Sequence, residues 1–138
     1  MRLMIDTNIF LDVLIHREPF YKNSKDVLYL CESGQVQGFL SASSVTDIFY
    51  LVRRQLHSIE MAYQALGSIL DIVRVLTVTN EDVLTAYAQR AADFEDCLLA
   101  TCAKNNRCEG IVTRNKKDFA SFGIPLLAPE ELLEKVQS

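Results

Sequence analysis

The chain has 138 residues, of which 49% are hydrophobic and 23% are charged, an ordinary composition for one globular domain. Its net charge of −4 disfavours a protein that holds nucleic acid through overall charge alone. No apolar run reaches the roughly 18 residues that a membrane span needs, and the N-terminus lacks a signal-peptide pattern. We therefore expect a single domain over residues 1–138 that resides in the cytoplasm without contacting a membrane.

Strand-like and helix-like segments alternate along the chain. In order, we predict a strand at 2–5, helices at 7–16 and from Pro19 to 33, a strand at 37–41, helices at 45–56 and 59–72, a strand at 74–78, helices at 81–91 and 94–106, strands at 110–113 and 124–127, and a last helix after Pro129. The expected helix N-caps are Ser43 or Ser44, Ser58, Asn80 and Asp93. This alternation indicates an α/β fold with a mainly parallel five-stranded sheet and helices on both faces.

Acidic and amide side chains lie where strands are predicted to end. Asp6 directly follows the first strand, Asn115 follows "GIVT" within two residues, and Asp96 opens the helix before that strand. Asp47 lies in mid-helix, opposite the apolar face. In doubly wound sheets, ligands bind outside the carboxyl ends of the strands. If the first and fourth strands are neighbours, these groups converge, and their oxygens could bind a hard divalent cation that activates water for displacement at phosphorus.

Each of these residues also has a structural explanation. Asp6 could cap the first helix, and Asn115 could cap the short turn that follows it. Asp93 and Asp96 together resemble a capping arrangement. Asp47 could belong to a solvated helix face, although capping cannot account for an acid in mid-helix.

Five basic residues lie near these polar positions in the sequence: Arg53, Arg54, Arg114, Lys116 and Lys117. They are either ordinary solvated surface or a basic rim that binds the phosphates of a polyanion around an acidic pocket. Histidine and cysteine offer little for a zinc site, since both histidines are isolated and the four cysteines fit no C-x-x-C pattern. We expect the cysteines to be buried thiols.

Four stretches resemble the PIN-domain ribonucleases, and they occur in the family's order over nearly the whole chain: "MIDTNIFLD" at the start, "SASSVTDIFY" at 41–50, "DFEDCLLATCAKNN" at 93–106 and "IVTRNKKDF" at 111–119. The resemblance implies a three-layer α/β/α sandwich and RNA cleavage that depends on Mg²⁺ or Mn²⁺. Many small bacterial members are VapC-type toxins, which implies an antitoxin partner and a homodimer.

The resemblance also implies roles for individual residues. The family's acidic positions fall on Asp6, Asp47 and Asp96, with Asp93 one turn earlier as a further metal ligand and with Asn8 and Thr113 as supporting groups. The fourth acidic position falls on Asn115, an amide that contributes no negative charge, and Asp47 stands where the family often has Glu. The five basic residues are the expected RNA contacts.

Two other functions compete with this interpretation. A PIN-like domain that has lost catalysis could serve as an RNA- or protein-binding module, and Asn115 favours that alternative. A phosphatase of the haloacid dehalogenase type also begins with an acid after its first strand. That family has a second Asp two residues later, where this chain has Asn8, so the sequence argues against it.

Overall fold

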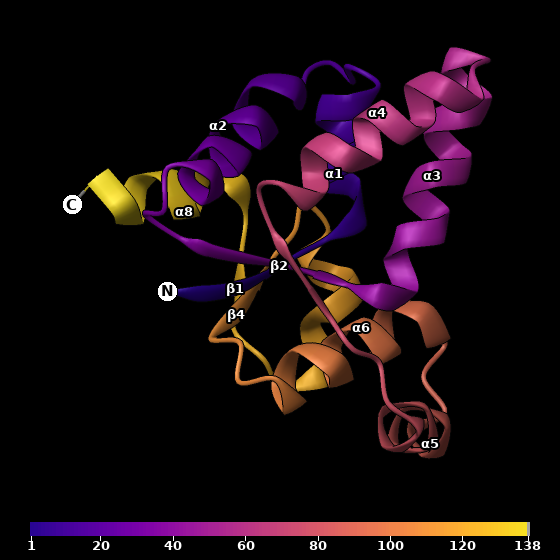
Figure 1. Cartoon of the computed structure of the whole chain (residues 1–138). Coiled ribbons are helices and arrows are strands. Elements are labelled where there is room, and N and C mark those ends of the chain that lie inside the picture. Colours follow the sequence, from indigo (N-terminus) through magenta and orange to yellow (C-terminus); the bar gives the residue numbers. More distant parts are fainter. Residues whose placement is uncertain (138) are drawn as a thin grey trace.

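A five-stranded sheet lies at the centre of the chain, and all of its strands run parallel (Figure 1). The computed structural model describes residues 1–137. The strands are β1 (Arg2–Ile5), β2 (Gln37–Ser41), β3 (Arg74–Leu76), β4 (Gly110–Val112) and β5 (Leu126–Leu127), in the order β3-β2-β1-β4-β5 across the sheet. The predicted five-stranded parallel sheet is confirmed, and β1 and β4 are neighbours.

Helices cover both faces of the sheet and complete three layers (Figure 1). One face is covered by α1 (Thr7–Leu14), α2 (Tyr21–Glu32), α3 (Ala42–Leu56), α4 (Ile59–Leu70) and α8 (Pro129–Gln137). The other is covered by α5 (Asn80–Gln89), α6 (Phe94–Asn105), α7 (Lys116–Phe119) and the 3-10 turn η1 (Ala120–Phe122). The predicted α/β/α sandwich is therefore confirmed.

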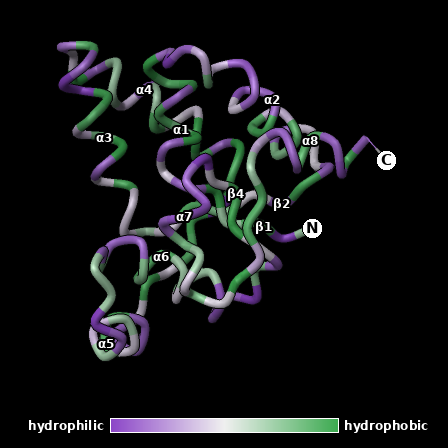
Figure 2. Tube along the Cα trace, turned by 180° about the vertical axis from the view of Figure 1, so that it is seen from behind, coloured by the Kyte–Doolittle hydropathy of each residue, from purple (hydrophilic) through white to green (hydrophobic). Residues whose placement is uncertain are grey.

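The two cores follow from the alternation of side chains along each strand. Leu3 and Ile5 of β1 pack into the core on the α1 side, while Met4 packs into the core on the α6 side. A strand buried on both faces must be apolar throughout, which explains the continuous run before Asp6. Figure 2 shows β1 and β4 as hydrophobic segments in the middle of the trace.

The start of α3 differs from its predicted position. The helix begins at Ala42, and its N-cap is Ser41 rather than Ser43 or Ser44. The Ser41 hydroxyl accepts a hydrogen bond from the Ser43 backbone N–H at 3.3 Å, so the last residue of β2 also caps the helix. Because no loop intervenes, α3 leaves the carboxyl edge of the sheet directly and carries Asp47 away from that edge by less than two turns.

Of the three other predicted helix N-caps, two are confirmed and one is wrong. Ser58 caps α4 and Asp93 caps α6, as predicted. The N-cap of α5 is Thr79 rather than Asn80. Thr79 has the extended backbone that a cap needs, and its hydroxyl and backbone N–H both exchange hydrogen bonds with Asp82 in a capping box.

Several elements are shorter than predicted, among them α1, α2 and β3. α1 ends at Leu14, because His16 adopts a left-handed backbone with φ of 48°. α2 begins at Tyr21, so Pro19 lies before the helix rather than in its first turn. β3 pairs with β2 only as far as Leu76, two residues short of the predicted end.

Two expectations from the composition concern the cysteines and membrane-spanning segments. The four cysteines are buried free thiols, as predicted. Within residues 1–137, no helix combines the length and the hydrophobicity that crossing a membrane requires.

Candidate active site

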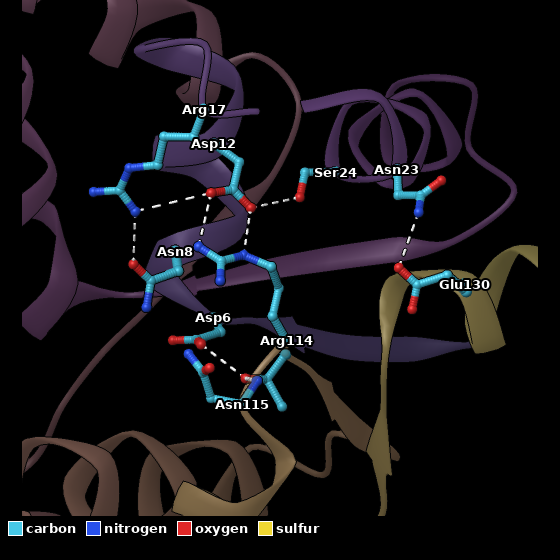
Figure 3. A network of polar contacts seen from close by, with 10 residues as sticks. Asp6, Asn8, Asp12, Arg17, Asn23, Ser24, Arg114, Asn115 and Glu130 are labelled. Carbon is cyan, nitrogen blue, oxygen red and sulfur yellow. Dashed lines mark hydrogen bonds and ion pairs between the residues drawn. The ribbon is translucent and has the colours of Figure 1, made fainter. Parts of the chain in front are cut away.

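Asp6 lies at the carboxyl end of β1, beside the end of β4. The register pairs Ile5 with Val112, so Asp6 and Thr113 follow their strands side by side. The Thr113 hydroxyl donates a hydrogen bond to Asp6 Oδ2 at 2.9 Å (Figure 3), and Asp6 is only 6% exposed. Burial raises the pKa of the Asp6 carboxyl, although the bond from Thr113 opposes this effect. Thr113 is thus the donor that holds a buried carboxylate at the sheet edge.

Carboxylates from three elements line one cavity of about 290 Å³ at this edge, which we call the acidic cavity. Its lining consists of Asp6, Asp47, Glu95 and Asp96, the polar residues Thr7 and Asn8, and the apolar residues Leu11, Leu51 and Leu99. Three of the acids expected from the sequence, Asp6, Asp47 and Asp96, therefore meet around one space. Convergence follows from the topology, because β1, α3 and α6 all present residues at the same edge.

Asp93 lies just outside the acidic cavity. Its Oδ1 accepts a hydrogen bond from the Asp96 backbone N–H at 3.0 Å, which caps α6. Asp93 is exposed and lines a neighbouring cavity with Asp96, Lys117 and Asp118. The cap fixes the first turn of α6, whose positive helix end favours the carboxylates there. The structure thus gives Asp93 a capping role next to the cavity.

Glu95 is a member of the acidic cavity that the sequence analysis missed. A hydrogen bond with Asp47 raises the pKa of Glu95 to about 7, and burial and the charges of Asp47, Asp93 and Asp6 act in the same direction. The available signal was the run "DFED", in which two acids occupy adjacent positions of a first helical turn. Adjacent residues lie about 100° apart on a helix, so only the packing of α6 decides that both Glu95 and Asp96 reach the cavity.

Asp96 shows the strength of the negative field. Burial raises the pKa of its carboxyl to about 7, and the charges of Asp93, Asp6, Asp118 and Glu95 add to the effect. Carboxylates this close hold protons unless a cation compensates their charge. The donor set is made of oxygen atoms, which is the ligand chemistry of a hard divalent cation such as Mg²⁺ or Mn²⁺. The residues present therefore fit such an ion.

The carboxylates surround the cavity without forming a finished ligand set. Within residues 1–137, no three acidic, histidine or cysteine side chains are close enough together to hold a metal ion as they stand. The structure thus shows the donors and the space but not a preformed coordination sphere.

Asn115 occupies the N-cap position of α7, yet its side chain makes no capping hydrogen bond. Its backbone N–H donates to Thr113 Oγ1 at 3.0 Å, so the same hydroxyl that holds Asp6 also fixes this turn. In Figure 3 the Asn115 amide points toward the Asp6 carboxylate. The capping explanation for Asn115 therefore does not apply, and the amide is directed at the site.

Arg114 lines a cavity together with Lys116 and Lys117, and its guanidinium pairs with a buried carboxylate. Its Nε and Nη2 donate to the two carboxylate oxygens of Asp12 at 2.7 and 2.9 Å (Figure 3). The guanidinium also lies over the Phe20 ring, 3.8 Å from its centroid. A role for Asp12 was not predictable from the sequence, because the two partners are 102 positions apart and nothing local pairs them.

The other basic residues fall in two separate places. Lys116 and Lys117 line a cavity beside Asn115, and Lys116 pairs with Glu131 of α8 at 2.8 Å. Lys117 also borders the cavity that contains Asp96. Arg53 and Arg54 line a different cavity, of about 720 Å³, at the turn between α3 and α4. The structure therefore shows basic residues next to the acidic cavity and a second group at the far end of α3.

An additional carboxylate at position 115 tests whether this residue belongs to a cation site. Asn115→Asp is expected to lower the melting temperature without metal by about 4 °C, since an added like charge costs on the order of 1 kcal/mol. Added Mn²⁺ should then stabilise the variant more than it stabilises the wild type. Parallel thermal melts with and without Mn²⁺ measure both effects. Equal metal-induced shifts in the two proteins would contradict a role for this position in cation binding.

Comparisons with known proteins identify the family and the fold of this chain. The sequence profile of the PIN domain family matches residues 2–117. No curated protein matches the sequence. Several solved structures share the fold. The DNA-bound VapBC complex of Salmonella typhimurium contains a chain with a TM-score of 0.72 and 17% identity, covering 94% of this chain and 98% of that one.

Two further structures are similar to the same extent. VapC20 of Mycobacterium tuberculosis, described as a toxin that cleaves the sarcin-ricin loop, has a TM-score of 0.68 and 17% identity over 88% of this chain and 95% of that one. A toxin–antitoxin complex of Klebsiella pneumoniae has a TM-score of 0.68 and 23% identity over 92% and 97%. At these identities the likeness establishes the fold, while the family profile covers most of the sequence. This chain belongs to the PIN domain family.

Proposed function

We propose that this chain is a metal-dependent endoribonuclease that acts in the cytoplasm as the toxin of a toxin–antitoxin pair. The observation that carries the proposal is the acidic cavity at the carboxyl end of β1, which carboxylates from three elements line and in which the pKa values of Asp6, Glu95 and Asp96 are raised. Membership of the PIN domain family and the likeness to solved toxin structures support the choice of RNA as the substrate.

Each cavity residue has a chemical role in this proposal. Asp6, Asp47 and Asp96 would hold Mg²⁺ or Mn²⁺, with Asp93 acting through the first turn of α6. When bound, the ion would lower the pKa of a water molecule and stabilise the negative charge that develops at phosphorus. Glu95 is suited to accept a proton from the attacking water near neutral pH, because its pKa is about 7. Asn8 lines the cavity and Thr113 holds Asp6.

The amide of Asn115 and the lysines beside it are proposed to contact the substrate. Asn115 can orient a phosphate oxygen or a water molecule, since its side chain is directed at Asp6. Lys116 and Lys117 can hold the flanking phosphates. Arg53 and Arg54 lie about two helical turns beyond Asp47, a distance of roughly 10 Å, where they could bind phosphates farther along the same RNA.

The test is cleavage of single-stranded RNA by the purified wild-type protein. We expect cleavage with Mn²⁺ or Mg²⁺, none with excess chelator, and recovery when the metal is restored. RNA that is bound but not cut with any divalent ion would favour a binding module without catalysis. Asn115 is the residue that favours this alternative, because its amide contributes no negative charge to the site.

We also propose a homodimer and an antitoxin partner. Large apolar side chains are exposed on α3, α4, α5 and the first residue of α6, namely Tyr50, Leu51, Tyr63, Leu84, Tyr87 and Phe94. Apolar groups gathered on neighbouring helices are characteristic of interaction surfaces. Sedimentation of the purified protein should give the mass of a dimer, and Tyr87→Glu should reduce it toward that of a monomer. A monomer at micromolar concentration would contradict the dimer.

A further inference from the structure

Asp12 is a buried carboxylate outside the acidic cavity. It is fully buried in α1, and its oxygens accept hydrogen bonds from Arg114 at 2.7 and 2.9 Å and from Ser24 Oγ at 2.8 Å (Figure 3). Arg17 Nη1 lies 3.8 Å from Asp12 Oδ1 and completes the group as a second cation. Every oxygen of this carboxylate is therefore engaged, and the group links α1, α2 and the turn after β4.

Two arms lead from Asp12 to residues of the proposed active site. Arg114 stands between Thr113, which holds Asp6, and Asn115, whose backbone N–H binds the Thr113 hydroxyl. Arg17 Nη1 donates to Asn8 Oδ1 at 3.0 Å, and Asn8 lines the acidic cavity. The group around Asp12 thus reaches the neighbourhood of Asp6 in two ways, through Arg17 to the Asn8 side chain and through Arg114 to the turn after β4.

A contribution to stability alone is a poor explanation for this arrangement. Burying two charges costs most of what their attraction returns, and apolar side chains of similar volume often stabilise a protein equally well. What an Arg–carboxylate fork supplies is direction, because two parallel N–H bonds fix the plane of the guanidinium. The Phe20 ring packs against the Arg114 guanidinium, with 3.8 Å between the guanidinium carbon and the ring centroid, and this contact further restrains the guanidinium plane.

We infer that the Asp12–Arg114 pair is a positioning device for the active site, which orients Thr113 and Asn115 toward Asp6. The inference rests on the proposed ribonuclease function. Neither Asp12 nor Arg114 touches the substrate in this scheme. Arg114 sets the path of the turn after β4, and that turn places the hydroxyl and the amide that act on the Asp6 side of the cavity.

The test uses substitutions that remove the fork but keep its volume. Asp12→Asn retains one acceptor and loses the bidentate pair. Partners that act behind the groups at a metal site are typically worth about 10- to 100-fold in activity, so kcat should fall at least about tenfold. KM should change less than about twofold, since a positioning defect leaves uniform substrate binding intact. Arg114→Lys keeps the positive charge but loses the bidentate geometry, so its kcat should be as low as that of Arg114→Met.

Asp82 provides a matched control. It is a buried carboxylate, 2% exposed, that accepts hydrogen bonds from the Thr79 backbone N–H and from Asn105 near the opposite end of α6. Asp82→Asn should lower the melting temperature as Asp12→Asn does and leave kcat unchanged. Equal losses of kcat in the two variants would show that Asp12 acts only through stability and would overturn the inference.

A second measurement separates this inference from the proposed function. Amide hydrogen exchange at Asn115 reports whether its N–H stays bound to Thr113, independently of any activity. Asp12→Asn should speed this exchange at least about tenfold, whereas Asp82→Asn should not change it. Unchanged exchange with unchanged kcat refutes positioning while ribonuclease activity stands. If the wild type cuts no RNA, the proposed function fails, and the exchange rates alone decide whether the pair orders the turn.

Discussion

Asp96→Asn is expected to reduce metal-dependent RNA cleavage by about 1,000-fold, with little change in RNA affinity. Asp96 lines the acidic cavity beside Asp6, and its carboxylate is one of the proposed metal ligands. Stabilisation of transition-state charge by a bound ion is worth several kcal/mol, and ~4 kcal/mol corresponds to about a 1,000-fold change in rate. The amide keeps the volume of the side chain but removes its charge, so the fold should be retained.

Asp96→Asn should change the cleavage rate but not the RNA affinity, because different residues determine these two quantities. The lysines beside Asn115 and the arginines at the end of α3 are unchanged in this variant. Single-turnover cleavage and fluorescence-based RNA binding, both in Mn²⁺, measure the two quantities independently. Asp71→Asn serves as the control, since Asp71 is an exposed acid after α4 and does not line the acidic cavity. Wild-type rates in highly purified Asp96→Asn would rule out Asp96 as a ligand.

The fold could be predicted from the sequence because its main signals are local. Apolar runs of strand length alternate with amphipathic segments, and this alternation specifies a parallel sheet covered on both faces. Asp6 could be placed at the carboxyl edge for the same reason, since it directly follows β1. The convergence of Asp47 and Asp96 on that edge required that β1 lie between β2, which leads into α3, and β4, which follows α6, and the register confirms both pairings.

The features that sequence reasoning missed depend on packing between distant segments. Ser41 was overlooked as a cap because it is also the last residue of β2, and a strand residue is not expected to start a helix. Glu95 reaches the cavity only because of how α6 is rotated against the sheet. The pair of Asp12 with Arg114 joins residues whose separation in the sequence carries no local pattern.

The stability of the metal-free protein is expected to fall as the pH rises from 5 to 8. Asp96 and Glu95 have pKa values of about 7 in the folded chain, against ordinary values of 3.8 and 4.5, and the pKa of Asp6 is also raised. Between these limits the folded state binds more protons than the unfolded state, so deprotonation favours unfolding. This contribution to stability is complete below about pH 4 and is lost as the pH passes through 7. Glu131, whose pKa is lowered, acts in the opposite direction but only at lower pH.

Asp96→Asn isolates the part of this slope that belongs to the acidic cavity. One pKa unit corresponds to about 1.4 kcal/mol, and solvent screening reduces the effect of a partly exposed group, so we expect about 1 to 2 kcal/mol from Asp96 between pH 5 and 8. For a domain of this size that is a melting-temperature difference of roughly 3 to 8 °C. The variant should lose less stability than the wild type over this range, and saturating Mn²⁺ should flatten the wild-type curve, because the ion binds the deprotonated carboxylates. Melts at intervals of half a pH unit, with chelator or with Mn²⁺, give the four curves. Wild-type and Asp96→Asn curves that run parallel in chelator would mean that the charge of Asp96 is already compensated in the folded protein, and the electrostatic basis for a cation at this cavity would then be lost.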